Sequence, residues 1–171
     1  GEEIPIPCRE RYGGKGWVLR NSKGQYTLTL DGLKAGSLER KTPALEIQGD
    51  LTLVLKKGTE SELLSTDAAL KKGAGTLTIR GEGSLRLQGE TALEGEWKEE
   101  TLNQDEPSAL RIEGGKLVFT GEETALYEDT VELAGGEIQI QCLNGKGTGI
   151  RAHTLDDRHF SGSLEMEESE E

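Results

Sequence analysis

The residues best suited to acid–base chemistry lie near the end of the chain. Arg151-Ala-His153 is followed by Asp156-Asp157 and by His159. Cleavage of a glycosidic bond needs two carboxyl groups held about 5–9.5 Å apart, and this group could in principle supply them. It lies, however, where the fold is expected to end, and no nucleophile elbow, phosphate-binding loop or metal-binding spacing of His and Cys occurs in the chain. We therefore expect no enzymatic activity.

Aromatic side chains are the second kind of candidate, because an aromatic ring packs on the apolar face of a sugar while planar polar groups bind its hydroxyls. Only 4% of the residues are aromatic. Trp97 stands in a polar stretch, and with Glu96 and Tyr127 it forms the expected ligand-binding set. The open alternative is that Trp97 packs this stretch onto the fold. Trp17 is expected to pack within the N-terminal region.

Acidic residues near the same places could bind calcium, which prefers several carboxylate and carbonyl oxygens. The candidates are Glu94, Asp105, Glu106, Glu128 and Asp129. The chain has a net charge of −12, and acidic groups on such a chain are usually only solvated, so calcium is an optional ligand and no cofactor is required. The same charge argues against nucleic acid as a partner. An acidic polysaccharide would need a bridging cation.

The two cysteines and the hydropathy pattern concern the environment of the protein. Cys8 and Cys142 match no metal-binding spacing, and we expect two separate thiols with Cys142 buried. No apolar run approaches the ~18 residues of a transmembrane helix, so no membrane insertion is expected. Because the sequence begins with Gly-Glu-Glu, a leader is expected to have been removed.

The elements that must position these residues repeat along the chain. Ala-Leu doublets occur at 44–45, 69–70, 92–93 and 125–126, and Gly149-Ile150 is a relaxed copy. The steps between their second residues are 25, 23, 33 and 24. Ala109-Leu110 belongs to a different, strand-forming phrase. The long step predicts an insertion at about residues 95–107, and insertions in repeat proteins form loops on one face.

Between the doublets, pairs of short strands are separated by glycine. The phrase from Leu110 to Ile112 is followed by Gly114-Gly115, and the phrase from Val131 to Leu133 by Gly135-Gly136. Apolar residues alternate with polar ones, which is typical of strands, and each strand is expected to have three to five residues. Glycine makes up 24 of 171 residues, about twice its usual ~7% share, and predicts corners with positive φ. Such strands are stable only when stacked, which predicts a parallel β-solenoid of about five or six coils.

Three phrases, in this order, resemble a known family: Tyr26-Thr-Leu-Thr-Leu-Asp-Gly, Gly49-Asp-Leu-Thr-Leu-Val-Leu-Lys-Lys-Gly-Thr and Gly75-Thr-Leu-Thr-Ile-Arg-Gly-Glu-Gly-Ser-Leu-Arg-Leu. They are similar to bacterial secreted or cell-surface right-handed β-helix proteins described as carbohydrate-binding domain-containing. The resemblance covers about residues 26–153. It implies an all-β, single-stranded right-handed parallel β-helix, a secreted or cell-surface location and polysaccharide binding, in some relatives with calcium.

The expected organisation has three parts: an N-terminal cap and first strand (1–25), the coils (26–164) and an acidic tail (165–171). The favoured function is a monomeric, non-catalytic, extracellular polysaccharide-binding module. The alternative is a structural or adhesive rod of a cell-surface protein without a small ligand. A glycan-cleaving enzyme is the least favoured reading.

Overall fold

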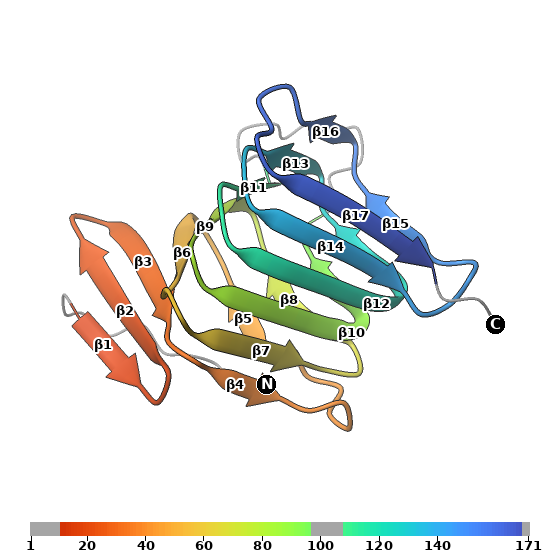
Figure 1. Cartoon of the computed structure of the whole chain (residues 1–171). Coiled ribbons are helices and arrows are strands. Elements are labelled where there is room, and N and C mark those ends of the chain that lie inside the picture. Colours follow the sequence, from red (N-terminus) through yellow and green to blue (C-terminus); the bar gives the residue numbers. More distant parts are fainter. Residues whose placement is uncertain (1–10, 97–107, 169–171) are drawn as a thin grey trace.

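A computed structural model describes residues 11–96 and 108–168 of the chain (Figure 1). The described residues form strands, turns and irregular segments, and none of them is helical. Parallel strands stack into a β-solenoid of about five coils, which confirms the predicted architecture. Each coil places one strand on each of three faces, called here faces A, B and C in the order in which the chain visits them.

Face A continues at its N-terminal side into two antiparallel strands. Its strands, in spatial order, are β1 (Arg11–Gly14), β2 (Trp17–Ser22), β3 (Gln25–Leu30), β6 (Leu51–Leu55), β9 (Gly75–Gly81), β11 (Ser108–Ile112), β13 (Thr130–Leu133) and β16 (Thr154–Asp156). From β3 onward all neighbours are parallel. β2 and β3 form a hairpin whose turn residues, Lys23 and Gly24, have φ values of 52° and 83°. Positive φ at both positions gives the strand twist that a two-residue hairpin needs.

Faces B and C are joined because two strands run around the corner between them. Face B contains β4 (Lys34–Gly36), β7 (Glu60–Leu64), the first halves of β10 (Ser84–Glu94) and β12 (Lys116–Tyr127), β14 (Glu137–Cys142) and β17 (Ser163–Glu168). Face C contains β5 (Leu45–Ile47), β8 (Ala68–Lys72), the second halves of β10 and β12, and β15 (Thr148–Arg151).

The lengths of β10 and β12 correct the sequence-based expectation, because these strands have 11 and 12 residues instead of three to five. The chain rounds the corner at Gly89 and Gly121 without leaving the strand, and the pairing register shifts between Gly89 and Thr91. A Cβ atom at Gly121 would lie 2.0 Å from the Thr124 carbonyl oxygen. The glycines therefore allow a bend too tight for any side chain.

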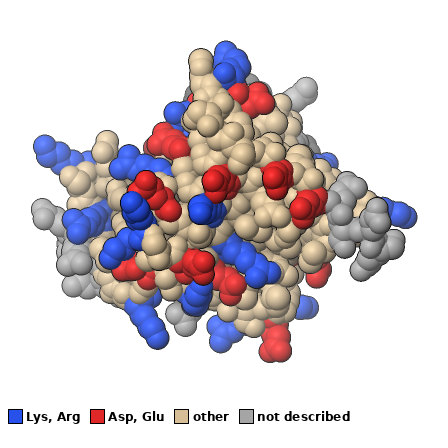
Figure 2. Space-filling model, in the orientation of Figure 1, with Lys and Arg blue, Asp and Glu red and all other residues tan. Residues whose placement is uncertain are grey.

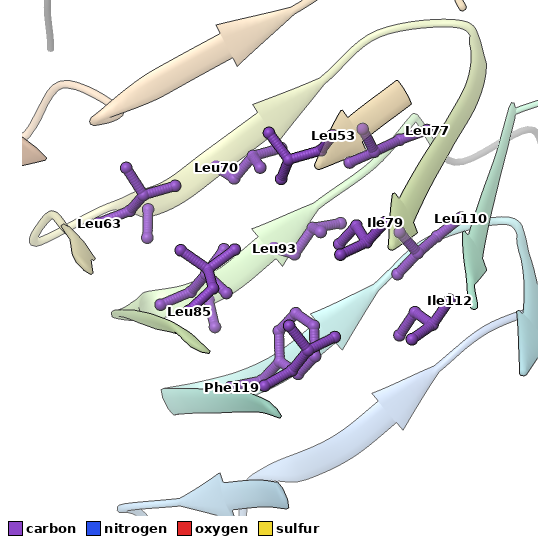
Figure 3. Close-up of a cluster of buried hydrophobic side chains, with 14 of the residues drawn as sticks. Leu53, Leu63, Leu70, Leu77, Ile79, Leu85, Leu93, Leu110, Ile112 and Phe119 are labelled. Atoms are coloured by element: carbon purple, nitrogen blue, oxygen red, sulfur yellow. The ribbon is translucent and has the colours of Figure 1, made fainter. Parts of the chain in front are cut away.

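The core is a stack of aliphatic side chains that repeats from coil to coil. On face C the register places Leu45, Leu70, Leu93, Leu126 and Ile150 in one column, which confirms the alignment predicted from the Ala-Leu doublets. Figure 3 shows how leucines and isoleucines of successive coils point into the same interior. Each residue stacks on its equivalent in the next coil because neighbouring parallel strands lie about 4.8 Å apart.

Glycine corners and the buried thiol follow the sequence prediction. Gly115 and Gly136 have φ values of 100° and 95°, the left-handed region that glycine adopts most readily. Cys142 is buried, as predicted, whereas Cys8 lies outside the described residues.

Candidate functional site

Most of the described candidate residues lie on one corner of the solenoid, where face C passes into face A. Elsewhere this passage is short: residues 73–74 connect β8 to β9, and residues 128–129 connect β12 to β13. Between β10 and β11 it comprises residues 95–107, so the long step in the repeat is an insertion at this corner. Trp97, Asp105 and Glu106 belong to it and lie outside the described residues.

The outer surface of face C carries one column of polar and aromatic side chains beside this corner. The pairing register stacks Glu46, Lys71, Glu94, Tyr127 and Arg151, one residue per coil. We call these five residues the outer column. Its members are exposed or half-buried, and successive ones lie about 4.8 Å apart along the axis of the solenoid. The structure thus brings the predicted residues Glu94 and Tyr127 side by side.

Neighbouring members of the outer column interact through a cation–π contact and through charge. The guanidinium carbon of Arg151 lies 5.8 Å from the centre of the Tyr127 ring, within the range of a cation–π interaction. Burial raises the pKa of Glu94, the positive charge of Lys71 acts in the opposite direction, and the negative charges of Asp67 and Glu90 raise it further. The column therefore offers a planar guanidinium, an aromatic ring, a carboxylate and an ammonium group in succession.

Glu128 occupies a different environment from the one expected of a calcium ligand at a corner. Its side chain is fully buried and forms an ion pair with the equally buried Lys72, with 2.9 Å between Nζ and Oε2. Ser108 Oγ and the backbone N–H of Asp129 donate hydrogen bonds to the other oxygen, Oε1, over 2.7 and 2.8 Å. This carboxylate is therefore neutralised inside the fold and does not face solvent.

Lys72 is the residue at this corner that the sequence analysis missed. Its ammonium group donates to Ser108 Oγ at 2.9 Å and to the Gly73 carbonyl at 3.0 Å. Its contact with Glu128 Oε2, at 2.9 Å, is the ion pair. The strand pattern carried a usable signal: Ala68 and Leu70 point inward, so the same alternation directs Lys72 inward. A lysine at an inward position calls for a buried anion.

A glycine in the coil between them allows Lys72 and Glu128 to meet. Extending the register by one residue aligns Lys72, Gly95 and Glu128 in three successive coils. Two coils span about 9.6 Å, so the two side chains must reach toward each other across the position of residue 95. A Cβ atom there would lie 2.3 Å from Glu128 Oε2. The absence of a side chain at Gly95 therefore creates the space in which the ion pair forms.

Other polar candidates are engaged by neighbours at the surface. Asp129 Oδ1 contacts Nδ1 of His153. The Arg158 guanidinium donates two hydrogen bonds to Asp156, of 3.0 and 2.9 Å, and its backbone N–H donates a third of 3.2 Å. These bonds lower the pKa of this carboxyl to about 2. A general acid in glycoside cleavage needs a raised pKa instead. Asp156 is thus held as a carboxylate.

Neither a metal-binding group of side chains nor a membrane-spanning helix occurs in the described part of the chain. In residues 11–96 and 108–168, no three His, Cys, Asp or Glu side chains are grouped so that they could hold a metal ion. The same part of the chain has no helix long and apolar enough to cross a membrane.

The architecture places the protein in the class of β-solenoids. No protein-family model matches the chain, and no curated protein and no solved structure shows significant similarity to it.

Proposed function

We propose that this protein is a non-catalytic, extracellular polysaccharide-binding module and that the outer column contacts the glycan. The observation that carries the proposal is the half-buried Tyr127 ring, which stands between Glu94 and Arg151 on the outside of face C. An aromatic ring provides an apolar platform for a sugar, and carboxylate and guanidinium groups bind its hydroxyls through paired hydrogen bonds.

The direction of the outer column suits a polymer better than a single sugar. Its five residues follow the axis of the solenoid, one per coil. Solenoids commonly bind extended ligands along such surfaces. A chain of sugar units lying parallel to the axis could therefore contact several coils at once. Polysaccharide binding, a secreted or cell-surface location and bacterial origin are also what the family resemblance of the three coil phrases implies.

Calcium remains part of the proposal as an optional aid to binding. With Glu128 paired to Lys72, the described carboxylates left for a cation at this corner include those of Glu94, the exposed Glu96 and Asp129. Asp129 already contacts His153, so a bound cation would compete with that contact. The binding experiment therefore includes one series with calcium and one with a chelator.

The test is affinity electrophoresis of the protein through gels that contain single polysaccharides, followed by titration with the one that retains it. Tyr127→Ala and Arg151→Ala should each weaken binding about tenfold, which corresponds to ~1.4 kcal/mol. Arg86→Ala is the matched control, because Arg86 is an exposed arginine on face B. Far-UV circular dichroism verifies the fold of each variant. Equal affinities of Tyr127→Ala and the wild-type protein would show that the outer column does not contact the glycan.

The second candidate function is a structural or adhesive rod without a small ligand. The observation that favours it is the C-terminal end of the described solenoid. Leu155 and Met166 continue the inward columns of Val131 and Ile140, yet they are 47% and 56% exposed. An apolar end of this kind suits contact with a further element of a larger assembly. Failure of every polysaccharide to retain the wild-type protein, with and without calcium, would leave the rod as the better proposal.

A further inference from the structure

A second site is suggested by a hollow at the N-terminal end of the solenoid. It has a volume of about 450 Å³ and lies between the β1–β2 turn and the first coil. Trp17, Leu33 and Ala44 form apolar parts of its wall, and Lys15, Lys34 and Arg40 are the cations that line it. The volume falls within the usual ~300–1,000 Å³ of small-ligand sites, which combine apolar walls with a few convergent polar groups.

Hydrogen bonds fix the backbone near Lys15 and at Arg40, and the ammonium group of Lys34 itself. The turn containing Lys15 is attached to the first coil, because Asp31 N–H donates to the Gly16 carbonyl at 2.7 Å. Lys34 Nζ donates to the Glu60 carbonyl at 3.0 Å. The Arg40 carbonyl accepts from the backbone N–H of Thr66 at 2.7 Å and from its hydroxyl at 2.8 Å. The rim of the hollow is therefore built before any ligand arrives, which reduces the entropic cost of binding.

The segment that contains every lining residue of the hollow has a charge of the opposite sign from that of the whole chain. Residues 11–45 contain seven Lys and Arg but only two Asp and Glu, a local charge of +5 in a protein of net charge −12. In Figure 2 the left side of the molecule, over β1–β3, carries more Lys and Arg than Asp and Glu. Clustered cations raise the local concentration of anionic ligands and favour their encounter with the site.

We infer that this hollow binds the carboxylate-bearing sugar units of an acidic polysaccharide. The carboxylate would pair with Lys34 and Arg40, and the apolar face of the sugar would pack on the exposed part of the Trp17 ring. An acidic glycan would then bind directly, in contrast to the sequence-based expectation that it needs a bridging cation. The inference rests on the proposed function for the glycan class, but it concerns a different surface from the outer column.

The test is isothermal titration calorimetry with a galacturonate trimer, compared with a neutral galactose trimer, at about 50 and 300 mM salt. The acidic trimer should bind, its affinity should fall at the higher salt concentration, and the neutral trimer should bind at least tenfold more weakly. The double variant Lys34→Gln/Arg40→Gln should lose at least tenfold in affinity for the acidic trimer. Glutamine retains much of each aliphatic stem, and Lys34→Arg/Arg40→Lys should restore binding because it keeps both charges.

Lys146→Ala is the matched control, since Lys146 is an exposed lysine in the turn before β15, outside the hollow. Equal binding of the two trimers, or unchanged affinity in the glutamine double variant with its fold intact, would overturn the inference. Binding of the acidic trimer that is lost in Tyr127→Ala but not in the glutamine variant would place the ligand on the outer column and would also overturn it. Binding lost only in the glutamine variant would support the hollow, whereas the outer column is tested by its own experiment with the polysaccharide that the gels retain.

Discussion

Removing one partner of the buried Lys72–Glu128 pair should destabilise the protein more than most single substitutions. Both side chains are 0% exposed and their charged atoms are 2.9 Å apart. Lys72→Met leaves the Glu128 carboxylate inside the fold with Ser108 and the Asp129 N–H as its remaining hydrogen-bond donors. A buried charge that loses its partner typically costs about 3–5 kcal/mol. We expect the free energy of unfolding to fall by that amount.

Urea denaturation followed by far-UV circular dichroism measures this loss. With a urea dependence of about 2 kcal/mol per molar, a loss of 3–5 kcal/mol lowers the midpoint by about 1.5–2.5 M. Glu128→Leu should have an effect of similar size, because it leaves the Lys72 ammonium buried without its carboxylate. A midpoint shift below about 0.5 M for either variant would contradict the expected energetic coupling.

Replacing the whole network should restore most of the lost stability. In Lys72→Met/Glu128→Leu the Ser108 hydroxyl would lose both polar partners, and an unsatisfied buried hydroxyl costs about 1–3 kcal/mol. The triple variant Lys72→Met/Ser108→Ala/Glu128→Leu removes this cost, and apolar replacements of buried ion pairs are often neutral. It leaves the half-buried Asp129 N–H without its acceptor, so it should lie within about 2 kcal/mol of wild type. Strict addition of the single-variant losses would refute the reasoning.

Gly95→Ala tests the steric part of the same argument. The new Cβ would lie 2.3 Å from Glu128 Oε2, so this substitution should cost at least the ~1–3 kcal/mol of an overpacked core. Glu128→Ala removes the atoms with which that Cβ collides. Gly95→Ala should therefore cost less in a Glu128→Ala background than in wild type. An equal cost in both backgrounds would show that the carboxylate does not require glycine at this position.

Two further predictions concern the core and the surface. Phe119→Ala should lower the free energy of unfolding by about 3–5 kcal/mol, because this ring is fully buried; urea denaturation beside Val118→Ala, a half-buried neighbour expected to cost less, checks it. Arg158 holds the folded-state pKa of Asp156 at about 2, below its unfolded value. The resulting stabilisation is present above pH ~4 and is lost as the pH falls toward 2. An NMR titration of the Asp156 carboxyl should show a higher pKa in Arg158→Ala, and an unchanged value would contradict the pairing.

The repeat can be predicted from the sequence because it depends on short-range patterns. Alternation of apolar and polar residues specifies the inward side of each strand, and equal steps between doublets specify which residues stack. Leu70, Leu93 and Leu126 lie in one column for this reason. The sequence does not predict that β10 and β12 continue around a corner. A glycine indicates a bend in the chain, but the pairing of neighbouring strands decides whether the strand continues through it.

The candidate site can be predicted only in part from the sequence. Its chemistry depends on whether each side chain near a strand end points into the core or toward solvent. Tyr127 is predicted as a ligand-binding residue and Glu94 as a separate calcium ligand, and the register places the two in adjacent coils. Glu128 was expected at the surface but is buried against Lys72. Position 128 continues the inward alternation of β12 after Leu126, so the burial followed from the exact strand phase.

The sequence alone determined the length of the coil, the residues that stack in the core and the corners that glycine permits, because these depend on period and local backbone preference. Tertiary structure decided which polar residues meet. Lys72 and Glu128 contact each other because the coil between them contributes Gly95. Lys15, Lys34 and Arg40 surround one hollow because β1 and β2 extend face A beyond the first coil and bring the turn between them beside it. Such contacts join separate coils, so they are specified by register and not by spacing along the chain.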